Sequence, residues 1–217
     1  MSGEIQLFIW GYNHSSWSMR AGIAVRQTGA PFREISAYVG DPEAAAVKAR
    51  SPSGLLPALQ HGAVAVWDSL AIGEYLAEEF PEAELWPRDK AVRAHARSAA
   101  AEMHSGFSTL RQQLPMNIQA HYPGFYQSAA VRAEVARVSS LWSDCLQRFG
   151  GPFLCGRFGL VDAFYAPVVM RFTSYDVELP PELAAYCEAA RTQPFVADWL
   201  RLARADTNRN PAYAYQR

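Results

Sequence analysis

Cysteine is scarce in this chain, and the way it is spread excludes two classes of protein. Cys145, Cys155 and Cys187 are the only three cysteines in 217 residues, and they include no C-x-x-C pair. A disulfide framework needs paired cysteines in a short chain, and a dithiol redox site needs the two thiols close together. We therefore expect the three cysteines to serve as small buried hydrophobic residues.

The sequence also lacks long apolar runs and an excess of one charge. No stretch reaches the roughly 18 apolar residues of a membrane-spanning helix, and the first residues, with Glu4 and Gln6, do not resemble a signal peptide. Twenty basic residues balance twenty-one acidic ones, for a net charge of -1. Such a balance gives no attraction to nucleic acid or to an anionic membrane. The composition predicts a cytoplasmic protein whose ligand is small.

The first 80 or so residues alternate between strand and helix patterns. An apolar strand over 5–10 leads through a serine cluster into a helical pattern that ends at Gly29, and a second strand covers 32–38. After an Ala-rich segment, a hairpin turning at His61–Gly62 is expected, followed by a helix over 69–80. This order predicts a compact sheet with helices on both faces.

Strand patterns stop after the proline-flanked segment 81–89, and helical patterns take over. We place the domain boundary there, between residues 1–81 and 90–217. The helix over 160–172 is apolar nearly all round, which is typical of the centre of a bundle. In all, five helices are predicted, over residues 91–114, 131–149, 160–172, 181–192 and 194–204.

The segment N-H-S-S-W-S-M-R (13–20) places three serines where the first strand gives way to a helix. Ser15 or Ser16 as an N-cap is a sufficient explanation, because a serine oxygen accepts a bond from the free amides of a first helical turn. A hydroxyl at this position can equally act on a ligand. The residues alone leave both interpretations open.

Two further features of the first half suit recognition of a peptide-like ligand. Pro57 opens a strand, so the Leu56–Pro57 bond is a candidate for the cis form with its peptide groups exposed to an extended ligand. The alternative is a proline that simply begins the strand. Asp68 and Ser69 open a helix, where they can act as caps. They can also bind the ammonium and carboxylate groups of an α-amino acid.

In the second half, A-E-M-H-S-G-F-S-T-L-R places His104, Phe107 and Arg111 at three- and four-residue steps, hence on one face of the predicted helix. An aromatic ring beside two potential cations suits an acidic or conjugated substrate, and His104 is a candidate general acid. The alternative is a helix face packed against a second copy of the chain.

These residues resemble the cytosolic glutathione transferases over about residues 5–202. S-S-W-S-M-R is similar to the S-S-C-x-x-R signature of the zeta class and its serine-type bacterial relatives. S-P-S-G-L-L-P resembles the loop before the family's cis-proline, and W-D-S-L-A-I-G-E-Y-L its acidic-Ser motif and helix. The resemblance implies an α/β thioredoxin-like N-terminal domain and an all-α helical-bundle C-terminal domain.

The same resemblance implies a function: a glutathione transferase that binds glutathione as a thiolate for attack on a small electrophile. Ser15, or its neighbour Ser16, is expected to donate a hydrogen bond to the sulfur, which favours thiolate over thiol. The electrophile is expected over His104, Phe107 and Arg111, and the protein is expected to be a homodimer. The other residues expected to surround glutathione are Trp17, Leu56, Pro57, Asp68 and Ser69.

Three departures from the family pattern stand out. Trp17 replaces the cysteine of the zeta signature, and its alignment with Ala21 and Ala24 favours a place in the core. Leu55 stands where relatives often carry a basic residue. Gly159 replaces the hydroxyl residue of a Ser/Thr-x-x-Asp capping box, leaving Asp162 to bond back to the chain. A zeta-type cis-trans isomerase and a noncatalytic binding protein of the same fold remain the alternatives.

Overall fold

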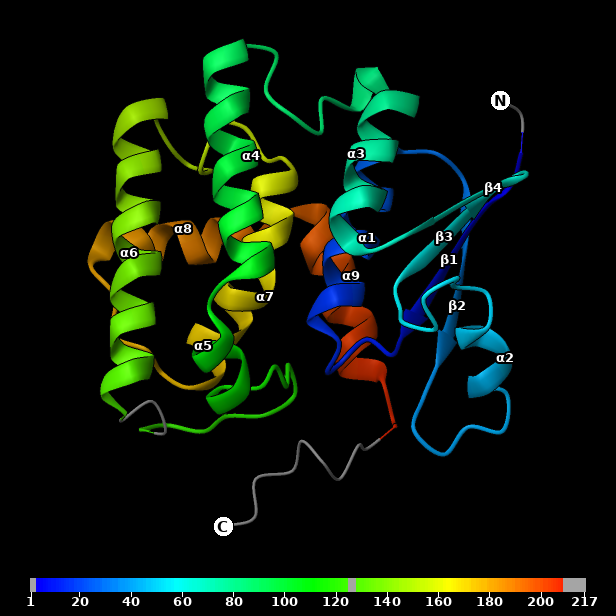
Figure 1. Cartoon of the computed structure of the whole chain (residues 1–217). Helices are drawn as coiled ribbons and strands as arrows, with labels where there is room; N and C mark the ends of the chain where they lie inside the picture. Colours follow the sequence, from blue (N-terminus) through cyan, green and yellow to red (C-terminus); the bar gives the residue numbers. More distant parts are fainter. Residues whose placement is uncertain (1–2, 125–127, 209–217) are drawn as a thin grey trace.

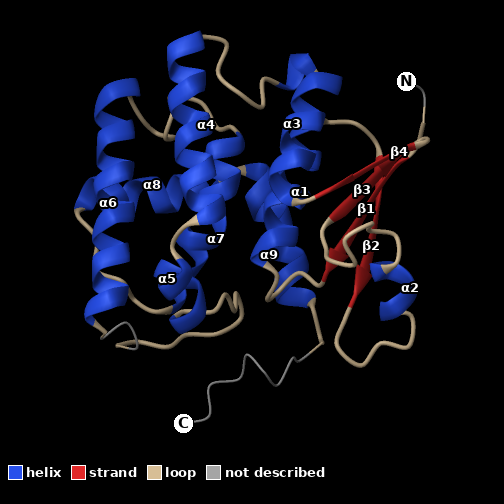
Figure 2. Ribbon diagram, viewed as in Figure 1, coloured by secondary structure: helices blue, strands red, loops and turns tan. Residues whose placement is uncertain are grey.

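A computed structural model of the chain describes residues 3–124 and 128–208. The first part holds a mixed four-stranded sheet in the order β2-β1-β3-β4 (Figure 2). Strand β1 runs parallel to β2 and antiparallel to β3, which in turn is antiparallel to β4. This confirms the α/β class predicted for the N-terminal half. The strands are β1 (Ile5–Trp10), β2 (Phe32–Ala37), β3 (Ala58–His61) and β4 (Val64–Trp67).

Helices cover both faces of the sheet, as the strand and helix order predicts. Helices α1 (Ser16–Thr28) and α3 (Ser69–Glu79) lie on one side of it, and the short α2 (Ala44–Lys48) lies on the other (Figure 1). Along β1 the side chains alternate. Leu7 and Ile9 enter the large core beneath α1 and α3, and Phe8 enters a small core beneath α2.

The second part is helical, and the large core continues into it. Helix α7 is buried along almost its whole length and packs on both α1 and α4, as expected for the centre of the bundle. No helix among residues 3–124 and 128–208 is both long and apolar enough to cross a membrane. A 3-10 turn (Pro81–Ala83) precedes the helices, which are α4 (Lys90–Ser105), α5 (Ser108–Gln113), α6 (Ala129–Phe149), α7 (Leu160–Ser174), α8 (Pro181–Thr192) and α9 (Pro194–Ala205).

The prediction of a single helix over 91–114 is wrong, because the helix is interrupted between α4 and α5. Phe107 adopts a left-handed conformation with φ of 56°, and the Glu134 carboxylate on α6 accepts bonds from the amides of Thr109 (3.3 Å) and Leu110 (2.6 Å). Glu134 thus supplies the cap that lets a new helix start after Gly106, a poor helix former. The described part of the second half therefore has six helices instead of five. The hairpin also turns one residue later than expected, at Gly62–Ala63.

The start of α7 explains the glycine in the capping box. Asp162 accepts bonds from the amides of Gly159 and Leu154, each at 3.0 Å, which confirms that it bonds back to the chain. A Cβ atom at position 159 lies only 2.9 Å from the carbonyl oxygen of Leu85. The close approach of Leu85 therefore excludes a larger residue here.

Candidate functional site

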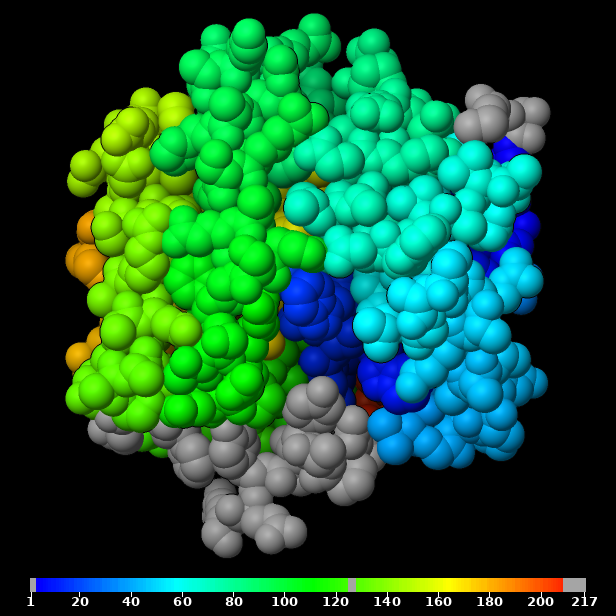
Figure 3. All heavy atoms as spheres, in the orientation of Figure 1, coloured from blue at the N-terminus to red at the C-terminus, as the bar shows by residue number. Residues whose placement is uncertain are grey.

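A hollow separates the helical half from the segment that carries α2, β3 and β4, and the start of α1 forms its floor (Figure 3). It contains two adjoining cavities that share Trp17, Leu55 and Leu56. One, of about 420 Å³, is completed by Ser53, Pro57, Trp67, Asp68 and Ser69. The other, of about 340 Å³, is completed by Trp10, His14, Ser15, Ser16, Lys48, Arg111, Pro115, Met116 and Arg171.

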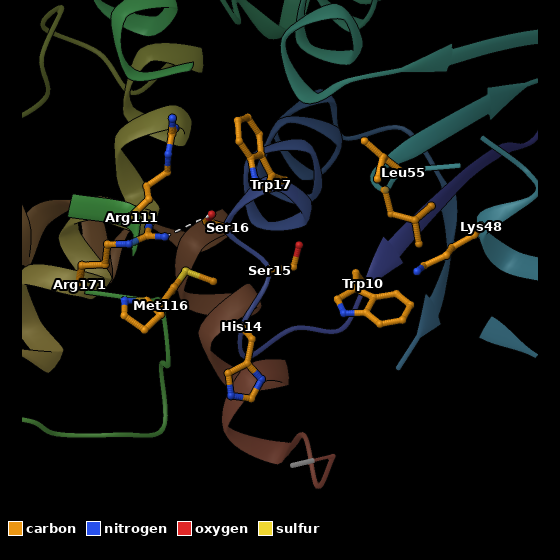
Figure 4. Close-up of a pocket in the computed structure, with 12 residues that line it drawn as sticks. Trp10, His14, Ser15, Ser16, Trp17, Lys48, Leu55, Arg111, Met116 and Arg171 are labelled. Carbon is orange, nitrogen blue, oxygen red and sulfur yellow. Dashed lines mark hydrogen bonds between the residues drawn. The ribbon is translucent and has the colours of Figure 1, made fainter. Parts of the chain in front are cut away.

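Ser15 is both the cap of α1 and part of the cavity wall. Its Oγ accepts a bond from the amide of Ser18 at 3.2 Å and donates one to the Ser18 Oγ at 2.9 Å. The side chain is half-buried and points into the open space between Trp17 and Leu55 (Figure 4). The capping and ligand-binding interpretations of this serine are therefore compatible.

Ser16 points in a different direction. Its side chain is buried, and its Oγ accepts a bond from Nη2 of Arg171 at 3.4 Å (Figure 4). Arg171 is itself buried and is held by the carbonyls of Leu114 and Pro167. The two neighbouring hydroxyls thus face different parts of the same cavity, Ser15 the open space and Ser16 a fixed cation.

Asp68 and Ser69 divide their roles at the start of α3. Asp68 is the cap, with its Oδ1 accepting a bond from the Leu70 amide at 2.7 Å, and its backbone has a φ of 73°. Ser69 is only 1% exposed, and its Oγ finds no hydrogen-bond partner among the described residues. Capping therefore explains Asp68 but not Ser69. Nearby, the Leu56–Pro57 bond is cis, which is one of the two alternatives that the sequence leaves open.

His104 contacts Asp68 across the boundary between the two halves. Its Nε2 lies 3.3 Å from the Asp68 Oδ2, and its ring stands edge-on to Trp17, with centroids 5.2 Å apart. Burial lowers the pKa of His104, Asp68 opposes this shift, and the charges of Arg20 and Arg111 add to it. The lowered pKa favours an uncharged His104 at neutral pH, in contact with the Asp68 carboxylate.

The helix break removes Phe107 from the helix face that the sequence predicts, whereas Arg111 stays close to His104, whose carbonyl accepts a bond from the Arg111 Nη1 at 3.4 Å. Phe107 is 7% exposed and lies in the hydrophobic core, so its predicted position beside the two cations is wrong. Arg111 does line the cavity, and its Nη1 donates a bond to the carbonyl of Met103 at 3.0 Å. Its guanidinium lies 5.2 Å from the ring centroid of Trp17. Trp17 thus stands between His104 and Arg111.

The core position favoured for Trp17 is also wrong. Ala21 and Ala24 are buried as expected, but Trp17 is only half-buried and forms part of the wall between the two cavities. One face of its indole covers the guanidinium of Arg20 at 4.5 Å from the ring centroid. The side chain therefore shapes the site instead of filling the core.

Arg20 adds a buried positive charge beneath the site. It is fully buried, and its guanidinium nitrogens make no hydrogen bond within the described part of the chain. Burial, with help from the charges of Arg171 and Arg111, lowers its pKa to about 9, while Asp68 raises it. The group remains charged at neutral pH, so three arginines make the floor of the hollow electropositive.

Several of these residues were missed by sequence reasoning. Arg171 stands alone as a cation in an otherwise apolar helix, and that isolation was a usable signal. Lys48 carried no such signal. It enters the cavity wall from α2, with its Nζ 4.5 Å from the ring centroid of Trp10, on the same side of the cavity as Leu55 (Figure 4). His14, Trp10 and Met116 line the same cavity.

Comparison with known families matches both halves of the chain. Residues 14–79 match the family model for the glutathione S-transferase N-terminal domain, and residues 90–189 match that for the C-terminal domain. The chain belongs to the glutathione S-transferase family.

Individual relatives agree with this assignment. Glutathione S-transferase 1 of Dianthus caryophyllus is 25% identical over 81% of each chain. Glutathione S-transferase Z2 of Arabidopsis thaliana is 27% identical over 88% of this chain and 89% of its own, in keeping with the zeta-like signature. A Burkholderia glutathione transferase homologue, solved with bound glutathione, has the same fold. It shows a TM-score of 0.71, 22% identity and coverage of 93% of this chain and 98% of its own.

Proposed function

We propose that this glutathione S-transferase binds glutathione across the two cavities and presents its sulfur to Ser15. The observation that carries the proposal is the buried Ser69 hydroxyl, which has no partner among the described residues and lines the larger cavity beside Asp68. An unpaired buried hydroxyl is costly, and a ligand carboxylate at the positive end of α3 satisfies it. Asp68 is then placed to accept from the ammonium group of the γ-glutamyl end.

The remaining parts of glutathione fit the residues along the cleft. The cis peptide at Leu56–Pro57 lies between the two cavities, where it suits the extended backbone of the tripeptide. Lys48 offers a cation for the glycyl carboxylate, which compensates for Leu55. When bound, glutathione supplies the nucleophilic thiol of the reaction. Ser15 donates a hydrogen bond to the sulfur, and the nearby arginines favour its anionic form.

The electrophile occupies the cavity that faces Arg111. All four charged or titratable side chains in the wall of this cavity, His14, Lys48, Arg111 and Arg171, are basic. Cations without a carboxylate among them favour an electrophile that carries an acidic group. An acidic electrophile is one of the two substrate types that the sequence predicts beside Arg111. In this proposal Phe107 does not contact the electrophile, and His104 acts on the glutathione side through Asp68.

The calorimetric test uses glutathione and S-methylglutathione, which keeps both carboxylates and lacks a free thiol. Both ligands should bind, and Ser15→Ala should retain S-methylglutathione while raising the pKa of bound glutathione. A raised pKa in Ser16→Ala alongside an unchanged one in Ser15→Ala would transfer the role to Ser16. With an aryl halide, thiol consumed in step with product indicates conjugation. With a maleylacetoacetate-like diketo acid, turnover without thiol consumption indicates isomerisation.

A second measurement tests the electrophile site. Arg111→Gln should raise the KM for a carboxylate-bearing electrophile about tenfold, on the scale of one charged hydrogen bond, and leave the KM for an uncharged aryl halide nearly unchanged. Equal effects on both substrates would contradict an anion-binding role for Arg111.

We also propose a homodimer in a reducing compartment such as the cytoplasm. Leu55 is 71% exposed and Trp67 is 45% exposed, and both border the larger cavity, so a second copy that covers them removes apolar surface from water. The three cysteines are all unpaired, as expected of a reducing environment. Sedimentation of the wild type and of Leu55→Ser, which should shift toward monomer, tests the oligomeric state.

A further inference from the structure

A second serine lies directly behind Ser15. Ser18 is the third residue of α1 and is fully buried. Its Oγ accepts a bond from the Trp10 amide at the end of β1, at 2.9 Å, and a bond from the Ser15 hydroxyl, also at 2.9 Å. Its own amide donates to the Ser15 Oγ at 3.2 Å. Two hydrogen bonds therefore connect Ser18 to the proposed sulfur partner.

The direction of one of these bonds matters for the reaction. In the structure the Ser15 hydroxyl donates its proton to Ser18, so this proton is not directed at a ligand in the cavity. A hydroxyl hydrogen turns freely about its C–O bond, and a serine oxygen is both donor and acceptor. In the structure the geometry of the 2.9 Å contact lets only Ser15 donate, so its reversal requires the Ser18 hydroxyl to turn toward Ser15 with a small adjustment of the side chains.

We propose that Ser18 is a positioning residue that strengthens Ser15 as a hydrogen-bond donor to the glutathione sulfur. On binding, Ser15 turns its proton to the sulfur and Ser18 turns its own to Ser15. A chain of bonds then runs from the Trp10 amide through Ser18 and Ser15 to the thiolate. No proton is transferred between the serines. This inference rests on the proposed function, specifically on Ser15 as the partner of the sulfur.

In the reversed arrangement the hydroxyl groups of Ser15 and Ser18 both have hydrogen-bond partners as donor and as acceptor. The Ser15 oxygen accepts from the amide and the hydroxyl of Ser18 and donates to the sulfur. The Ser18 oxygen accepts from the Trp10 amide and donates to Ser15. Hydrogen bonds in such a chain polarise one another, so the terminal donor is stronger than an isolated hydroxyl. Ser16 has no part in this chain, because its Oγ faces Arg171.

The test measures the pKa of the bound thiol from thiolate absorbance as a function of pH. Ser18→Ala should lower the ionisation constant of bound glutathione about threefold to tenfold, the range of one neutral hydrogen bond, and leave the Kd of S-methylglutathione nearly unchanged. Ser18→Cys replaces the hydroxyl with a slightly larger and weaker donor and should fall between wild type and Ser18→Ala. Ser98→Ala is the matched control, since within residues 3–124 and 128–208 that exposed helical hydroxyl bonds only to the Ala94 carbonyl.

A double variant separates positioning from a general structural effect. In Ser15→Ala the chain has already lost its terminal donor, so adding Ser18→Ala should not change the thiol pKa further. An unchanged pKa in folded Ser18→Ala, or an effect of full size in the Ser15→Ala background, would overturn the proposal. If Ser18→Ala does not fold, Ser18→Cys provides the same comparison. Failure of the wild type to bind S-methylglutathione would instead refute the proposed function.

Discussion

The side chains of His104 and Asp68 meet across the boundary between the two halves of the molecule, beside the proposed glutathione site, with 3.3 Å between Nε2 and Oδ2. Asp68 simultaneously caps α3 through its other oxygen. One carboxylate therefore links α4 of the second half to the N-terminus of α3 in the first. A change at His104 should be felt both in stability and in the binding of the γ-glutamyl end.

The first prediction concerns the pH dependence of stability. Burial lowers the pKa of His104 in the folded state, so below about pH 6.5 the unfolded chain takes up a proton that the folded chain does not. Stability should therefore fall as pH decreases through this range, and His104→Gln should flatten that part of the curve. Melting temperatures of the wild type and of His104→Gln between pH 5 and 8 measure this pH dependence.

The control for this prediction is His121→Gln, since His121 is an exposed histidine paired with Asp176 away from the cleft. The glutamine at position 104 retains an amide donor for Asp68, so glutathione affinity at pH 8 should stay within a few-fold of wild type. The same flattening in both variants would show that the effect is not specific to the contact with Asp68.

The second prediction concerns Ser69. Ser69→Ala should weaken glutathione binding by about 1 to 3 kcal/mol, because a buried carboxylate loses a hydrogen bond. The melting temperature of the free protein should not decrease, since this hydroxyl has no partner among the described residues. Calorimetry and thermal melting of one preparation give both values. A lower melting temperature with unaltered affinity would contradict the binding role.

The third prediction concerns Trp17, which separates the two cavities. Because the indole is half-buried, Trp17→Cys should cost less than the 3 kcal/mol or so of a core aromatic truncation. The smaller side chain should widen the space beside Arg111 and increase activity toward bulky acidic electrophiles relative to a small aryl halide. A large loss of stability with equal loss of both activities would instead support a core role.

The fourth prediction concerns the start of α7. Gly159→Ser restores the hydroxyl of the family's capping box, yet it should destabilise the protein by about 1 to 3 kcal/mol, because its Cβ meets the Leu85 carbonyl at 2.9 Å. Gly151→Ala is a suitable control, since a Cβ at that position meets nothing within 4 Å. Urea denaturation compares the two. A stabilised Gly159→Ser variant would show that Leu85 can move away.

The local elements of this protein follow from its sequence. The strand over 5–10, the ends of α1 at Gly29 and of α3 before Pro81, and the buried α7 depend on periodicity, caps and proline, which act within a few residues. The residues proposed to surround glutathione follow from motifs of the same short range. Ser15, Pro57 and Asp68 each stand at the end of such an element, where backbone groups are free to meet a ligand.

The tertiary structure decided which distant side chains meet. Glu134 caps α5 and so breaks the helix predicted over 91–114, which buries Phe107. His104, in the last turn of α4, meets Asp68 at the start of α3. Arg171 reaches Ser16 from 155 residues away, and Lys48 enters the cavity from α2. Periodicity assigns a residue to a face of its own helix, but its partner depends on how the helices pack. Trp17 shows the difference: its spacing matches buried alanines, and only the meeting of α1 with α4 and α5 makes it a wall of the site.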